Sequence, residues 1–162
     1  MSNQISYDKL KVNCPYPIQN VTELKIMNCF NEHGRVKVKG ILWADKRDQC
    51  INSASTDDQI EVYDRSDSGD DVKLFSGIVT SLKVKHMKGI YYVEIEGASY
   101  TYLLDHKLVS RSFQDKNAMY SAVIGQVLAD YNKAYYIQIP EDCPTGGFIL
   151  QYKEPDWTFI KR

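Results

Sequence analysis

The densest set of possible metal ligands is an aspartate-rich segment. Within residues 64–71, Asp64, Asp67, Gly69 and Asp70 partly reproduce the loop in which carboxylates at alternate positions surround calcium. The spacing departs from that pattern, and no glutamate follows where a bidentate ligand is needed. Because turn aspartates commonly bond their own backbone, we interpret this segment as an exposed loop rather than a calcium site.

The histidines and cysteines form no recognisable reactive pattern. His33, His86 and His106 lie far apart, and none has the HExxH spacing that presents two imidazoles to one zinc ion. No CxxC pair occurs among the cysteines, which are Cys14, Cys29, Cys50 and Cys143. Without an export signal the thiols are expected to stay reduced, so we predict free cysteines.

Motifs for covalent catalysis or phosphate binding are also missing. The sequence contains no GxSxG elbow, and Gly146-Gly147 belongs to neither of the glycine-rich loops that cradle phosphates. We therefore predict no catalytic, cofactor-binding or metal-binding residue and no cofactor. The protein is expected not to be an enzyme.

A lysine-rich hairpin segment resembles a surface that binds single-stranded nucleic acid, where cations follow phosphates and aromatic rings stack on bases. Its residues are Lys83, Lys85, Lys88, Tyr91 and Tyr92. Alternation places the lysines on a solvent face, and Glu94 and Glu96 are expected to neutralise them. The net charge of −1 adds no attraction for polyanions. A small-barrel module binding oligosaccharide or single-stranded nucleic acid remains the alternative function.

Length and composition indicate an ordinary soluble chain. Its 162 residues suit one domain, or one domain plus part of another. No apolar run approaches the ~18 residues that cross a bilayer, so no membrane insertion is expected. The N-terminal residues 1–6 lack the charged and apolar blocks of a signal peptide. We expect synthesis in the cytoplasm, which is compatible with later release in a large particle.

The elements that would position any site are mainly strands in the first hundred residues. Alternating or strand-compatible segments are 9–12, 21–30, 35–40, 59–63, 72–84 and 91–96, with a loop or short helix at 45–57. Gly77 and Gly97 inside strand patterns indicate bends of a curved sheet. The fold class predicted is mainly β with an α+β extension, with a small antiparallel β-barrel over residues 1–106.

Residues 107–162 are predicted to begin an α+β domain. A short helix at 99–105 precedes strands at 107–113, 135–139 and 148–152. Between them Asn117 is expected to cap a helix whose buried stripe runs from Tyr120 to Tyr131 at three-four spacing.

The chain closes with the opening of another helix. Pro155 suits the first helical position, and Asp156 suits the positive end of the helix dipole. Trp157 and Ile160 share one face, with Phe159 near its edge. About two turns cannot hold themselves without packing, so we expect these aromatic side chains to need a covering layer and the domain to be truncated.

Several segments in order resemble a known family. They are Leu74–Val79, Ser99–Asp105, Arg111–Gln114, Ala122–Leu128 and Gln151–Arg162. The last, Q-Y-x-E-x-D-W-x-F-I-x-R, is the most specific, although Pro155 stands where the family usually has a small residue. These segments are similar to the N-terminal part of contractile-tail baseplate hub proteins, namely the phage late control D protein and the valine-glycine repeat (VgrG) spike protein of type VI secretion.

This resemblance implies a homotrimeric hub, in which two similar barrels per subunit form a ring joining the tail tube to a spike. The implied partners are sister copies, a tail tube protein and a spike protein or spike domain, with no nucleic acid. The implied location is a virion tail or injection-system particle, with a prophage as the expected source. The sequence leaves open whether the particle is a phage, a bacteriocin-like particle or a secretion system.

Overall fold

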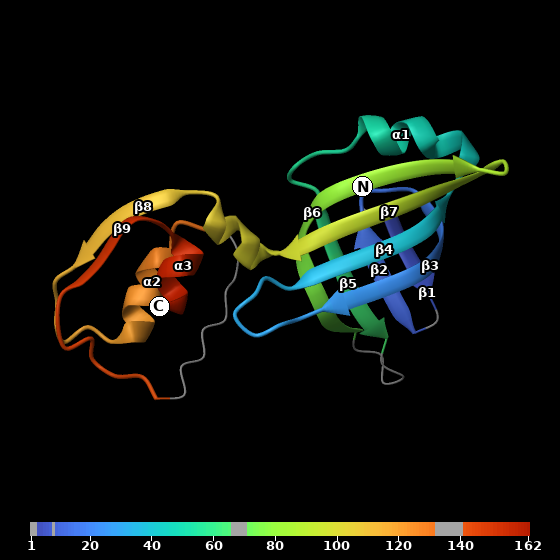
Figure 1. Cartoon of the computed structure of the whole chain (residues 1–162). Helices are drawn as coiled ribbons and strands as arrows, with labels where there is room; N and C mark the ends of the chain where they lie inside the picture. Colours follow the sequence, from blue (N-terminus) through green and yellow to red (C-terminus); the bar gives the residue numbers. More distant parts are fainter. Residues whose placement is uncertain (1–2, 8, 66–70, 132–140) are drawn as a thin grey trace. The chain divides into compact units, whose positions relative to one another are not determined.

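The computed structural model describes residues 3–7, 9–65, 71–131 and 141–162 (Figure 1). Contacts divide the chain into two compact units, Met1–Tyr100 and Thr101–Arg162. Each unit has a hydrophobic cluster of its own. The strand predicted at residues 135–139 lies outside the described residues, as does most of the aspartate-rich loop.

Seven antiparallel strands form the sheet of the first unit, in the order β1-β2-β5-β6-β7-β4-β3. Their bounds are β1 Asn3–Tyr7, β2 Leu10–Cys14, β3 Ile18–Met27, β4 Arg35–Leu42, β5 Gln59–Arg65, β6 Asp71–Met87 and β7 Ile90–Ser99. The sheet curls strongly (Figure 1), and its outermost strands β1 and β3 contact each other. This curled antiparallel sheet confirms the predicted mainly-β, barrel-type fold.

Strand alternation decides which side chains fill this curled sheet. In β4, Val36, Val38 and Leu42 are buried, while Lys37 and Lys39 stand on the outer face. Neighbouring strands repeat the pattern, so that aliphatic side chains gather inside and charged ones outside. Burying each such aliphatic side chain contributes roughly 1.5–3 kcal/mol, and a one-residue slip would expose the whole set.

Two glycines have specific backbone roles in the β6–β7 hairpin. A Cβ on Gly77 would lie 2.0 Å from the carbonyl oxygen of Ala98, so the strands approach there as only glycine allows. At the turn, Lys88 and Gly89 both have positive φ angles, of 51° and 79°. That pair of angles fits a two-residue turn whose twist matches that of the strands.

Residues 45–57 contain the short helix that the sequence left as one possibility. The 3-10 helix η1 (Ala44–Lys46) leads into α1 (Arg47–Asn52), which buries Cys50 in the core of the first unit. Arg47 contacts the hydroxyl of Tyr91 and lies over its ring. After the helix, the carboxylate of Asp58 accepts a hydrogen bond of 2.7 Å from the buried Tyr16 hydroxyl. These contacts fasten the helical connection to the sheet.

The second unit combines a two-stranded sheet with short helices. Its elements are η2 Tyr100–Asp105, β8 Leu108–Phe113, α2 Tyr120–Leu128, β9 Ile149–Pro155 and α3 Asp156–Lys161. β8 and β9 pair antiparallel. Val123 and Val127 of α2 pack with Phe159 of α3 in the core of this unit, and Phe113 packs against them.

The beginning of α2 differs from the prediction. The N-cap residue is Met119, not Asn117, and it makes no capping bond through its side chain. Instead, the Asp142 carboxylate accepts hydrogen bonds from the backbone N–H and the hydroxyl of Ser121. These bonds lower the pKa of Asp142. A distant loop therefore supplies the cap, which local sequence spacing does not reveal.

Candidate functional site

Among the described residues, the histidines and cysteines do not come together in a cluster that could hold a metal ion. His86 stacks on Tyr91 with ring centroids 4.3 Å apart, and His106 meets Tyr102 edge-on at 4.9 Å. Over the described residues, no group of three or more His, Cys, Asp or Glu side chains could hold a metal ion. Cys14 and Cys50 are buried free thiols, and burial raises the pKa of each to about 11. Thiols held protonated in this way are poor nucleophiles.

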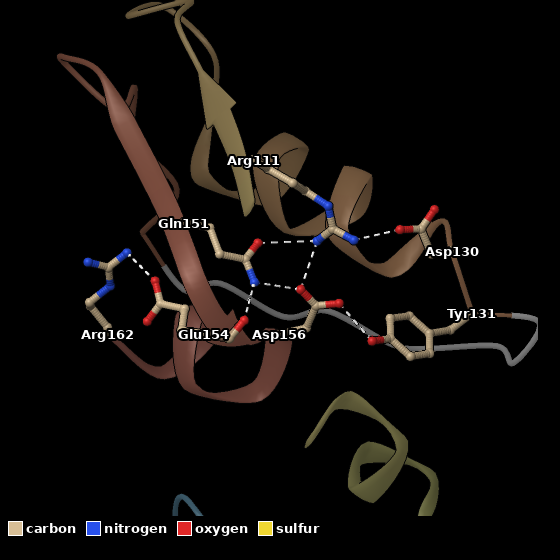
Figure 2. Close-up of polar contacts among 7 residues, drawn as sticks. All are labelled: Arg111, Asp130, Tyr131, Gln151, Glu154, Asp156 and Arg162. Carbon is tan, nitrogen blue, oxygen red and sulfur yellow. Dashed lines mark hydrogen bonds and ion pairs between the residues drawn. The ribbon is translucent and has the colours of Figure 1, made fainter. Parts of the chain in front are cut away.

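The most highly organised polar cluster lies instead in the second unit, around Asp156 (Figure 2). The Asp156 side chain is only 1% exposed. Its Oδ1 accepts hydrogen bonds from Nη1 of Arg111 at 2.8 Å and from Nε2 of Gln151 at 2.7 Å. Its Oδ2 accepts one from the Tyr131 hydroxyl at 2.7 Å. The second guanidinium nitrogen of Arg111 pairs with Asp130 at 2.5 Å. We call Arg111, Asp130, Tyr131, Gln151 and Asp156 the arginine–aspartate network.

Strand periodicity explains how Arg111 enters this network. Val109, Arg111 and Phe113 alternate with the exposed Ser110 and Ser112, so the arginine shares the inner face of β8 with apolar neighbours. Across the ladder, Arg111 is opposite the fully buried Gln151 of β9. The pairing therefore brings the guanidinium and the amide to the same inner face.

A β-bulge brings Asp156 to that face as well. The register shifts between Val109 and Arg111, and Lys153 has a positive φ of 47° with its N–H bonded to the Ser110 hydroxyl. In an unbroken strand, residues 151 and 156 would point to opposite faces because side chains alternate. The extra residue in β9 resets the alternation, so Gln151 and Asp156 both point inward.

The charges of the network stabilise the fold, because the buried carboxylate of Asp156 is fully paired. A carboxylate taken out of water is costly unless it is paired and fully hydrogen-bonded, and Asp156 meets both conditions. Its donors come from β8, from the end of the α2 segment and from β9. The network thus ties the start of α3 to three other parts of the unit.

A second set of contacts secures the C-terminal helix. Arg162 donates to the Leu150 carbonyl oxygen at 2.7 Å and pairs with Glu154 at 2.8 Å. The rings of Phe113 and Phe159 stack with centroids 5.8 Å apart. The residues that carry the sequence resemblance, from Arg111 to Arg162, are therefore largely the residues that hold this unit together.

The helix expected at the end of the chain is present as α3, but it begins one residue later than predicted. Pro155 ends β9 and is the N-cap of α3, so the helix begins at Asp156. The buried positions are Asp156 and Phe159, whereas Trp157 and Ile160 are only partly buried. Asp156 lies in the first turn of α3, as expected, and it also accepts hydrogen bonds from side chains of the network. One feature of the sequence indicates the network: Arg111 is a charged residue at an inward-facing position of an alternating strand.

Glu94 was expected to neutralise the lysines of β6, and it lies directly opposite Lys83 in the β6–β7 ladder. Lys37 contacts both Glu94, at 2.6 Å, and Glu96, at 3.3 Å. The hydrogen bond from Lys37 is the main cause that lowers the pKa of Glu94, and the charges of Lys37, Lys85 and Lys83 lower it further. The two glutamates thus contact a lysine of β4, while Glu94 also interacts electrostatically with the lysines of β6.

Comparison with known proteins identifies the fold through solved structures only. No family model and no curated sequence matches the chain. The tail protein from Neisseria meningitidis MC58 superposes with a TM-score of 0.67 at 12% identity, covering 94% of this chain and 43% of that one. The E. coli c3393 protein, a type VI secretion component described as structurally similar to the T4 tail proteins gp27 and gp5, gives 0.54 at 13% identity, covering 86% and 42%.

These comparisons show a shared fold. The chain spans less than half of the length of the two solved structures. In the described part of the chain, no helix has the length and apolar character needed to cross a bilayer.

Proposed function

We propose that the chain is a structural part of the baseplate hub of a contractile phage tail or a related injection system. The observation that carries the proposal is the fold, since the likeness to a tail protein extends over 94% of the chain and includes both units. In this proposal, residues 1–106 form the tube-type barrel domain and residues 107–162 open an α+β domain that continues in the complete protein.

The side chains of the second unit support a mechanical role. Its buried polar groups hydrogen-bond to one another and so hold β8, β9, Tyr131 and α3 together, with Asp156 at the centre. A part that transmits force needs such fixed geometry, whereas catalysis needs a reactive group that a substrate can reach. The proposed assembly is a homotrimeric ring that links a tail tube protein to a spike, within a virion tail or injection-system particle.

The test is the assembly state of the complete gene product. Size-exclusion chromatography with light scattering should give three copies per particle, and negative-stain electron microscopy should show rings. A strict monomer over a wide range of protein concentration and ionic strength would refute the hub. A ring of a different copy number would refute the trimer and keep the assembly role.

A second candidate, a module binding single-stranded nucleic acid or oligosaccharide, rests on the exposed lysines of β6. Lys83 and Lys85 line a surface groove together with Tyr92, which could serve as a stacking surface. Fluorescence anisotropy with short labelled oligonucleotides and glycans distinguishes the two functions. Tight binding that weakens steeply with salt favours the nucleic-acid module.

A further inference from the structure

The outer face of the first unit carries a groove rich in lysine, which we call the lysine groove. Lys39, Lys83 and Lys85 line it, together with Thr22, Tyr92 and Glu94. It encloses about 270 Å³ and crosses strands β3, β4, β7 and β6. Lys83 and Lys85 are both exposed. The groove is therefore an accessible surface that is lined from several strands.

Existing ion pairs leave positive charge in this groove. Lys39 pairs with Glu23 at 2.6 Å, and Lys37 holds Glu94 and Glu96. Within the described part of the chain, no carboxylate lies within ion-pair distance of Lys83 or Lys85. Glu94 balances part of their charge, and the remaining positive charge of Lys83 and Lys85 is exposed to an outside partner.

A second groove on the same unit carries the opposite charge, and we call it the acidic groove. Asp57, Asp58 and Glu61 line it, with Asn13 and Gln59. It encloses about 370 Å³, and the Asp57 side chain is exposed. Glu61 already pairs with Lys73 at 2.8 Å, whereas no cation among the described residues pairs with Asp57. The groove is therefore acidic where it meets solvent.

The two grooves are too far apart to meet within one molecule. Glu61 is paired in register with Ser76 of β6, while Lys83 and Lys85 lie further along the same strand. At about 3.3 Å per residue, Ser76 and Lys83 are separated by roughly 23 Å. Attraction between the grooves can therefore be satisfied only between molecules.

We propose that the lysine groove of one copy docks on the acidic groove of a second copy. The inference rests on the proposed assembly role and names the surfaces that would form its contacts. Such a contact joins two different patches, so repetition makes a ring if the rotation closes. A second copy is the proposed occupant because the same molecule carries a groove of the opposite charge, which a single copy cannot bring to its own lysine groove.

Two charge-reversed variants of the chain test the contact. Variant A carries Lys83→Glu and Lys85→Glu; variant B carries Asp57→Lys and Gln59→Lys. All four side chains are exposed, and Asp58 is left unchanged because it holds Tyr16. Sedimentation velocity at low and high salt measures self-association. Each variant alone should associate at least tenfold more weakly than the native chain, and an equimolar mixture should recover association because reversed charges then face each other.

The control matched to variant A is Lys107→Glu with Lys116→Glu, which makes the same change in net charge at exposed positions of the other unit. It should leave self-association within about twofold of native, and circular dichroism should show all variants folded. The inference is overturned if both variants associate like the native chain, if the mixture stays monomeric, or if the native chain does not associate. It is also overturned if variant A loses binding to a single-stranded oligonucleotide instead. A ring formed by the complete gene product despite insensitivity to these variants would leave the proposed function standing.

Discussion

Removing the Arg111 guanidinium should unfold the second unit. Arg111→Met keeps most of the aliphatic stem and deletes the charge, so it tests the ion pair rather than packing. Asp156 would stay buried with only neutral donors, a situation that typically costs about 3–5 kcal/mol. Because Arg111 is 20% exposed, water can reach the gap, and we expect a value near the lower end, about 3 kcal/mol.

That loss is large for a unit of this size. A core of roughly 60 residues rarely supplies more than about 3–5 kcal/mol, so the variant should have its second unit largely unfolded without denaturant. The two tryptophans allow the units to be followed separately, since Trp43 belongs to the first and Trp157 to the second. In a Trp43→Phe background, urea titration of Trp157 fluorescence measures the second unit.

Two further variants separate the possible explanations. Arg111→Met with Asp156→Leu removes both charges and should recover part of the loss, because the uncompensated carboxylate is gone. Arg162→Met breaks an exposed pair, in which the arginine side chain is 55% exposed, and should cost less than about 1 kcal/mol. If Arg111→Met alone shifts the unfolding free energy by less than about 1 kcal/mol, the network is not the fastening described here.

Two other perturbations address the first unit and one helix of the second. Gly77→Ala should lower the thermal midpoint by the equivalent of roughly 1–3 kcal/mol, because its Cβ would overlap the Ala98 carbonyl. Gly125→Ala in α2, where the added Cβ meets open space, should instead stabilise the protein by up to about 1 kcal/mol. Equal effects of the two substitutions on the thermal midpoint would contradict this account. Burial raises the pKa of Cys14 and Cys50 from 9.0 to about 11, so the folded state keeps protons that the unfolded chain loses, and stability should fall from about pH 9 to about pH 11. Urea midpoints at about pH 8 and about pH 10.5 should differ less in a Cys14→Ala/Cys50→Ala variant than in the native chain; an unchanged difference would remove the thiols from the explanation.

The first unit was largely predictable because its strands alternate. One face of each strand is buried, so the apolar positions of the alternating pattern predict which side chains lie inside. In residues 35–40 these are Val36 and Val38. The length of β6 and the turn at Gly89 followed from the same pattern. Alternation of apolar and polar residues is sufficient to predict strands whose two faces meet core and solvent.

The second unit was less predictable because distant residues complete its local elements. Asp142 caps α2 in place of Asn117, and Arg111 pairs with a helix residue far along the chain. The β9 bulge also brings Asp156 to the same face as Gln151, which strand alternation alone would not place there. Such features depend on pairings that only the folded chain brings together.

The bulge at Lys153 also limits how this protein can change over evolutionary time. Of the residues between Gln151 and Asp156, Tyr152 and Lys153 are exposed, so their side chains can change, and position 153 needs a residue that accepts a left-handed backbone. A single-residue insertion or deletion in the same interval would turn the aspartate away from its arginine. The number of residues between Gln151 and Asp156 should therefore be conserved even in relatives in which the residue types between them differ.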